Sequence, residues 1–188
     1  MNEFPKEEFL TDFLRKKIVQ EEQFNQWLRI LFYLNNELTK KWDFVYQDMF
    51  YIKFYEVMTE GFSYANKVFE DLKKGENQNK LEFYEELIKG LTIMKSELQE
   101  DEYNYIEYRR HNICHIFQNG YEYIQDNLKI KKEIKGKDLQ KIKNEFEKII
   151  DKYGSDKNFD IFLNKKLQPN LTQLYTKLIG IHNKQYNL

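Results

Sequence analysis

The residues best suited to chemistry in this sequence gather between positions 109 and 115. The chain has 26 Lys but only four Arg and three His, and four of these seven rarer side chains fall in the run RRHNICH. Arg presents a planar fork that matches phosphate oxygens, and His exchanges protons near neutral pH. The run, which contains Arg110, His111 and His115, therefore favours phosphodiester chemistry.

A helix over residues 101–124 is predicted to carry this run, because apolar residues recur along it at helical spacing. On an ideal helix both His111 and His115 face away from the apolar stripe, and Arg110 and His115 lie about 140° apart. One chain would not easily bring both to a single phosphate unless the helix were distorted. A second copy of the chain solves this geometry, which predicts a homodimer.

The spacing of Arg110 and His115, with the polar His111 directly after the arginine, resembles the R-x4-H signature of the HEPN superfamily. The resemblance implies an all-α bundle, a metal-independent endoribonuclease and a site built by two copies of the motif across a two-fold axis. It also implies that Arg110 binds the scissile phosphate and that His115 is the general base or acid at the ribose 2′-hydroxyl. Arg109 is the motif arginine if the register is R-x5-H, and the sequence leaves both registers open.

The resemblance further implies RNA as substrate and a role in toxin–antitoxin or phage-defence systems, with an antitoxin protein as a candidate partner. Seven Lys against two acidic residues between 129 and 143 give a basic segment just after the motif. The candidate substrate-binding residues are Arg109, Asn112, Lys129, Lys131, Lys132 and Lys135. An ordinary solvated lysine-rich loop explains the same segment equally well.

Two further functions compete with the ribonuclease. A degenerate, non-catalytic helical module would bind protein or nucleic acid through the same face. A metal-dependent bundle enzyme would use His111 and His115 at i, i+4, but a third ligand would have to come from His182 or a distant carboxylate. We therefore expect no metal and no cofactor. Cys114 lies nearer the apolar side, which predicts a buried, unreactive thiol.

The composition limits the fold and the cellular setting. The chain has 188 residues, 41% hydrophobic and 32% charged, with 7 Gly and 2 Pro, which disfavours both a disordered chain and a turn-rich β fold. A single Cys excludes an intrachain disulfide and a multi-Cys zinc module. The first residues, MNEFPKEEF, lack the pattern of a secretory signal, and no apolar run is long enough for a membrane span, so we expect neither feature. These features predict a soluble, cytoplasmic protein with no membrane partner.

Apolar spacing predicts an all-α single domain, an antiparallel bundle of six to seven helices. The helices are expected near 5–19, 20–41, 51–72, 79–98, 101–124, 139–153 and 169–181, with a further short helix at 157–166. Asn79 and Asp101 are predicted N-caps, Gly154 a helix end and Pro169 a helix start. The core is expected over about 20–153, followed by a C-terminal helical extension over about 155–188.

Overall fold

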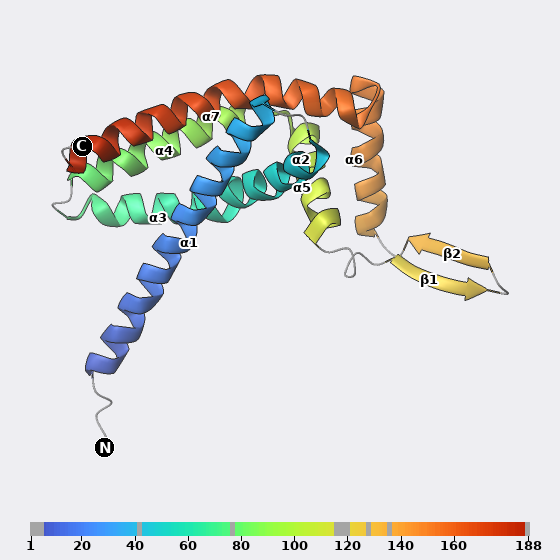
Figure 1. The fold of residues 1–188 in the computed structure, drawn as a ribbon. Helices are drawn as coiled ribbons and strands as arrows, with labels where there is room; N and C mark the ends of the chain where they lie inside the picture. The colour runs from blue at the N-terminus through green and yellow to red at the C-terminus, as the bar shows by residue number, and fades with distance from the viewer. Residues whose placement is uncertain are drawn as a thin grey trace, which may run out of the picture.

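The computed structural model describes residues 6–40, 43–75, 78–114, 121–126, 129–134 and 137–186. Its described part is dominated by helices that pack into one bundle, so the predicted all-α helical bundle is confirmed (Figure 1). The helices are α1 (Lys6–Lys40), α2 (Phe44–Glu56), α3 (Phe62–Leu72), α4 (Gln78–Glu97), α5 (Glu100–Cys114), α6 (Lys137–Tyr153) and α7 (Asp156–Tyr186). A π-helical segment, Val57–Gly61, joins α2 to α3, and two short strands, β1 (Tyr121–Asp126) and β2 (Lys129–Ile134), form a hairpin.

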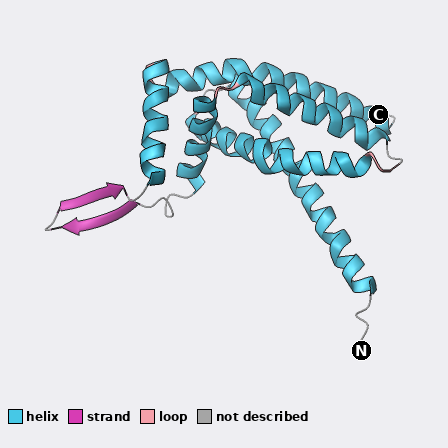
Figure 2. Cartoon of the chain, turned by 180° about the vertical axis from the view of Figure 1, so that it is seen from behind, coloured by secondary structure: helices cyan, strands magenta, loops and turns pink. Residues whose placement is uncertain are grey.

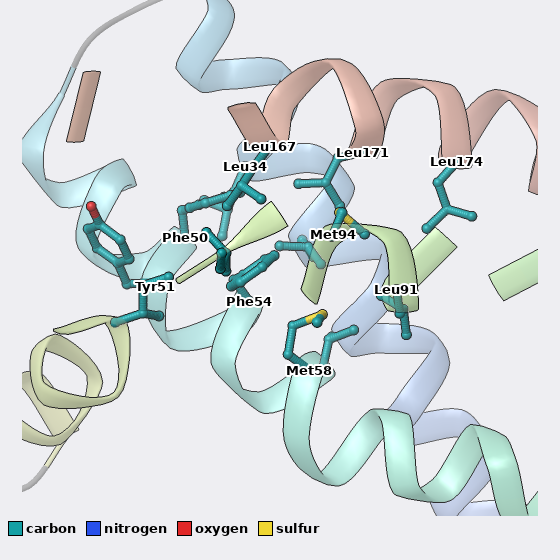
Figure 3. Packing of buried hydrophobic residues seen from close by; sticks show 14 of the residues in the cluster. Leu34, Phe50, Tyr51, Phe54, Met58, Leu91, Met94, Leu167, Leu171 and Leu174 are labelled. Carbon is teal, nitrogen blue, oxygen red and sulfur yellow. The ribbon is translucent and has the colours of Figure 1, made fainter. Parts of the chain in front are cut away.

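One hydrophobic core runs through the bundle and draws on α1, α2, α4 and α7. Figure 3 shows Phe50 and Phe54 of α2 facing Leu167 and Leu171 of α7, with Met94 of α4 beside them. All five side chains are fully buried. Because burying one such side chain contributes about 1.5–3 kcal/mol, this packing holds the helices together more than their intrinsic propensity does.

The C-terminal segment is part of this core. Phe159, Leu163, Leu167 and Leu171 are all completely buried, and α7 lies along α4 and crosses α1 (Figure 1). The residues expected as an extension after position 155 therefore contribute to the same core as residues 20–153. Figure 2 shows the same arrangement from behind.

Pro169 was predicted to open the last helix, and this prediction is wrong, because α7 begins at Asp156 and contains Pro169 at an exposed position. The helix start is instead fixed by Ser155, whose Oγ accepts a hydrogen bond from the Asn158 N–H at 3.1 Å. Gly154, with φ of 80°, ends α6 as predicted.

The two helices predicted at 5–19 and 20–41 form one continuous helix, α1. The sequence between them contains no Gly, Pro or capping signal that would stop a helix. The N-terminal part of α1 extends beyond the bundle (Figures 1 and 2), and Leu14, Ile18 and Val19 on it are 54%, 63% and 60% exposed. Among the described residues, no helix has both the length and the apolar character needed to cross a bilayer.

The helix predicted over 101–124 is wrong at its end, since Tyr121–Asp126 is a strand, whereas α5 spans Glu100–Cys114 and residues 115–120 lie outside the described residues. The register pairs Ile124 with Lys131 and Tyr123 with Lys132. Alternating Tyr, Glu, Tyr and Ile at 121–124 suits a pleated strand as well as a helix face. The two strands pair mainly with each other and project to one side of the bundle (Figures 1 and 2).

Candidate functional site

Helix α5 carries the arginine and histidine run, and its N-terminal half fixes its position. It begins at Glu100, so Asp101 lies in its first turn and is not the predicted cap. The Gln99 N–H donates to Glu102 Oε2 at 3.0 Å, which caps the helix start. Further along, the fully buried Tyr105 packs its ring edge-on against Phe159 of α7, with the ring centroids 5.0 Å apart. The arginine and histidine run therefore follows a part of α5 that is packed tightly against α7.

Helix α4 likewise begins at Gln78, one residue before Asn79, so Asn79 is not an N-cap. Both misplaced caps lie within one or two residues of the actual helix start. The error reflects a choice between neighbouring polar residues, each of which can satisfy the free N–H groups of a first turn.

Arg109 is held inside the protein by three neighbours. Its guanidinium donates a hydrogen bond to Asp48 of α2 and another to the Tyr105 hydroxyl at 3.3 Å. It also lies over the Tyr51 ring, 5.3 Å from the centroid, and the Arg109 side chain is 19% exposed. Burial alone would lower the pKa of Arg109, but the hydrogen bonds to Asp48 and Tyr105 raise it above its usual value. Arg109 thus joins α5 to α2.

A second carboxylate lies next to this arginine in the interior. The buried Tyr51 hydroxyl donates to Asp160 of α7, which is 8% exposed. Burial raises the pKa of Asp160 to about 6, although the Tyr51 hydrogen bond and the Arg109 charge act against the rise. We call Asp48, Tyr51, Tyr105, Arg109 and Asp160 the Arg109 cluster. Beside it, Asn164 Nδ2 donates to Gln47 Oε1 at 2.9 Å, a second buried link between α7 and α2.

Arg110 lies in a different environment from Arg109. Its guanidinium is over the ring of Tyr55, 5.7 Å from the centroid, and the residue is half-buried. The Tyr55 hydroxyl donates to Glu107 Oε1 at 3.1 Å. Burial and the Glu107 charge raise the pKa of Tyr55 to about 12, and the Arg110 charge partly opposes this. Adjacent arginines of the run therefore contact different parts of α2.

The other predicted site residues are only partly within the described structure. His111 and Asn112 lie in the last turn of α5, and Lys129, Lys131 and Lys132 lie in β2, but the side chains of all five are outside the described residues. His115 and Lys135 are outside the described residues altogether. The structure thus places Arg109 and Arg110 but leaves the pairing of Arg110 with His115 a prediction.

Another buried carboxylate, Glu102, lies at the opposite end of α5. It is 1% exposed and accepts hydrogen bonds from Lys152 at 3.0 Å and from the Tyr153 hydroxyl, both of α6. Burial would raise the pKa of Glu102, but these bonds and the one from the Gln99 N–H lower it overall. This group joins α5 to α6. In the described part of the chain, no three His, Cys, Asp or Glu side chains are grouped as metal ligands would be.

The residues that contact Arg109 and those that contact Glu102 were not identified from the sequence. A signal was present in α7, where Asp160 and Asn164 occupy i and i+4 beside the fully buried Phe159 and Leu163. Polar residues that continue an apolar stripe are candidates for buried hydrogen-bonded positions. Their partners Gln47 and Tyr51 share the same spacing in α2, but nothing local in the sequence connects the two helices.

A scan against protein-family models, a search of curated proteins and a search of solved structures each found no match. The function of this chain therefore has to be inferred from its own residues. Those residues are the RRHNICH run at the end of α5 and the lysines that follow it.

Proposed function

We propose that this chain is a metal-independent endoribonuclease that cleaves RNA through Arg110 and His115 in a homodimer. The observation that carries the proposal is the different use of the two adjacent arginines. Arg109 is committed to Asp48 and Tyr105 inside the bundle. This supports Arg110 as the phosphate-binding arginine and therefore the R-x4-H register with His115.

The proposed chemistry needs only proton transfer and charge stabilisation. His115 removes the proton from the ribose 2′-hydroxyl, which attacks the adjacent phosphorus in line. Arg110 stabilises the negative charge that develops on the phosphoryl oxygens, and His111 assists. The P–O5′ bond breaks, and a proton goes to the departing oxygen. The products are a 2′,3′-cyclic phosphate and a 5′-hydroxyl, and DNA is spared because it lacks the attacking group.

The packing of α5 supports the assignment of Arg110 as a catalytic residue. A catalytic group must be held within a fraction of an ångström of its working position, and groups on packed helices meet that need best. The buried Tyr105 and Ile106 and the Arg109 cluster fix the helix one turn before Arg110. We assign RNA docking to Asn112 and to the lysines of the hairpin region.

A non-catalytic module is the second candidate, and the half-burial of Arg110 over Tyr55 favours it. In that case the same face of α5 would bind RNA or a protein such as an antitoxin without cleaving the backbone. The two candidates differ in a single measurement, cleavage of RNA by the purified chain.

The test compares Arg110→Ala and His115→Ala with the wild type on a fluorescent single-stranded RNA in EDTA. We expect each variant to lose about 10²–10⁴-fold in cleavage rate, as removal of an acid–base group or a charge-stabilising group does. Arg15→Ala and His182→Ala are matched controls on exposed helix positions and are expected to cleave normally. No cleavage by the wild type would support the binding module, and unchanged cleavage by both variants would refute the mechanism.

Mixing the two inactive variants tests whether the site is shared between subunits. If Arg110 of one subunit acts with His115 of the other, a mixed dimer regains one intact site. Random exchange of subunits should then restore about a quarter of wild-type activity. If both groups act within one chain, the mixture stays inactive.

A further inference from the structure

A cavity of about 450 Å³ lies between α1, α4 and the C-terminal part of α7. This volume is within the range of about 300–1,000 Å³ that small-molecule sites occupy. The elements that form it meet on the opposite side of the bundle from the end of α5 (Figure 1). The proposed ribonuclease does not account for this cavity.

The cavity walls are rich in aromatic rings. Phe32 of α1 packs against Tyr175 of α7 with ring centroids 5.0 Å apart, and Phe83 and Tyr84 of α4 meet edge-on at 5.5 Å. Tyr84 is 3% exposed, whereas Tyr175 is 45% exposed at the mouth. Aromatic walls that pass from buried to exposed in this way suit a flat apolar ring that enters from solvent.

The charged groups of the cavity do not balance one another. Lys80 pairs with Glu21 at 2.9 Å, so this acid and base neutralise each other. Arg29 donates through Nε to the Asn25 carbonyl oxygen at 3.3 Å, and no carboxylate of the described residues lies within salt-bridge distance of it. A guanidinium beside an aromatic cavity recognises a carboxylate, sulfonate or phosphate group through charge-assisted hydrogen bonds.

We propose that this cavity binds a small aromatic anion, with its ring packed against Phe32, Phe83 and Tyr175 and its anionic group on Arg29. The site is separate from the proposed ribonuclease site and does not depend on it. The preferred ligand has both an aromatic ring and an anionic group. The aromatic side chains supply most of the contact area, and Arg29 supplies the preference for negative charge.

The test uses two fluorescent probes of nearly the same shape on the full chain. 8-Anilinonaphthalene-1-sulfonate carries an anionic group, and N-phenyl-1-naphthylamine lacks it. We expect the sulfonate to bind one per chain and about tenfold more tightly than the uncharged probe, since one charge-assisted contact accounts for about that factor.

Two pairs of variants locate the binding. Arg29→Gln should weaken the sulfonate about tenfold and leave the uncharged probe unchanged, and Arg15→Gln on the same helix is its control. Ile179→Trp should fill the cavity and weaken both probes at least tenfold, and Ile161→Trp is its control. The two isoleucines lie on α7 and are 38% and 37% exposed, so neither substitution removes a core side chain.

Several outcomes would overturn the proposal. Sulfonate binding that survives both Arg29→Gln and Ile179→Trp would place the probe elsewhere, for example on the exposed apolar part of α1. Equal losses in the control variants would show a general effect on the fold, which circular dichroism of each variant would also detect. Equal affinity for the two probes would refute the selection for an anion. Loss of RNA cleavage has no bearing on any of these results.

Discussion

Burial and hydrogen bonding shift the pKa of Asp160 in opposite directions. Burial dominates and raises the pKa of Asp160 to about 6. The groups around it are the Tyr51 hydroxyl, the Arg109 guanidinium and the carboxylates of Asp48 and Asp156. A buried acid with this pKa binds a proton in the folded state at a pH where the unfolded chain has already released it.

The pH dependence of stability follows from this difference. Between about pH 4 and 6 the folded chain holds more protons at Asp160 than the unfolded chain does, so stability from this residue falls as pH rises. Asp160→Asn, which keeps an acceptor for Tyr51, should remove this decline. We expect the free energy of unfolding of the wild type, minus that of the variant, to fall by about 2 kcal/mol between pH 4 and 7, measured by urea unfolding. A constant difference across that range would contradict the assignment.

The pKa of Glu102 is shifted in the opposite direction from that of Asp160, so Glu102 serves as an internal comparison. Although burial opposes it, bonds from Tyr153, Gln99 N–H and Lys152 lower the pKa of Glu102. Stability from Glu102 is therefore present above its unfolded pKa and lost as pH falls through its lower folded pKa. The two buried carboxylates thus respond differently because Glu102 accepts hydrogen bonds from Tyr153, the Gln99 N–H and Lys152, whereas burial dominates at Asp160.

At the scale of the element, Gly61 lies where the α2–α3 helix packs closely against Phe24 of α1. A Cβ on Gly61 would lie 2.7 Å from Cε2 of Phe24, a ring that is 3% exposed and packs on Tyr64. Gly61→Ala should therefore destabilise the fold by about 1–3 kcal/mol through overpacking, despite the better helix propensity of Ala.

Gly180 is the matched control, because it is also helical but its Cβ would meet nothing within 4 Å. Gly180→Ala should stabilise the protein by about 0.5–1 kcal/mol. Chemical unfolding of both variants measures the contrast. Stabilisation by both substitutions would show that Phe24 moves aside without cost.

The sequence predicted helices well where the apolar stripe was long, as in the α2–α3 stretch, which runs as one helical path through the π-helical segment. It failed where the signal was local and ambiguous. Pro169 lies inside α7, whose start is capped by Ser155 instead, and the alternation at 121–124 was compatible with either a helix or a strand.

The candidate site was predictable only in part. The RRHNICH run stands out by composition alone, but the Asp48–Arg109 pair joins residues 61 positions apart. Tertiary packing decides which of two adjacent arginines is internal, and a single sequence contains no local sign of that choice. The aromatic cavity was missed for the same reason, since its walls come from three helices.

At the scale of the whole molecule, the hairpin is the outlying basic element. Its strands contribute Lys129, Lys131 and Lys132 and extend to one side of the bundle (Figure 1). In the proposed function these lysines contact RNA phosphates. The triple change to Gln should weaken binding to an uncleavable 2′-O-methyl RNA and reduce the salt slope by about 2, at about 0.7 per lost phosphate contact.

A triple change to Gln at Lys157, Lys165 and Lys184, all exposed on α7, is the matched control and should leave the slope unchanged. Fluorescence anisotropy at several salt concentrations gives both slopes. If the two triple variants weaken RNA binding equally, the hairpin has no special role, and RNA affinity depends only on the net charge of the protein.

Asn35 of α1 donates to Thr172 of α7 at 3.1 Å, a contact between residues 137 positions apart. The same helix α7 supplies buried side chains along most of its length. During synthesis, which proceeds from the N-terminus, α1, α2 and α4 therefore leave the ribosome before their packing partner exists. Their apolar faces stay uncovered until α7 emerges, so we expect the nascent chain to expose apolar surface to chaperones until then.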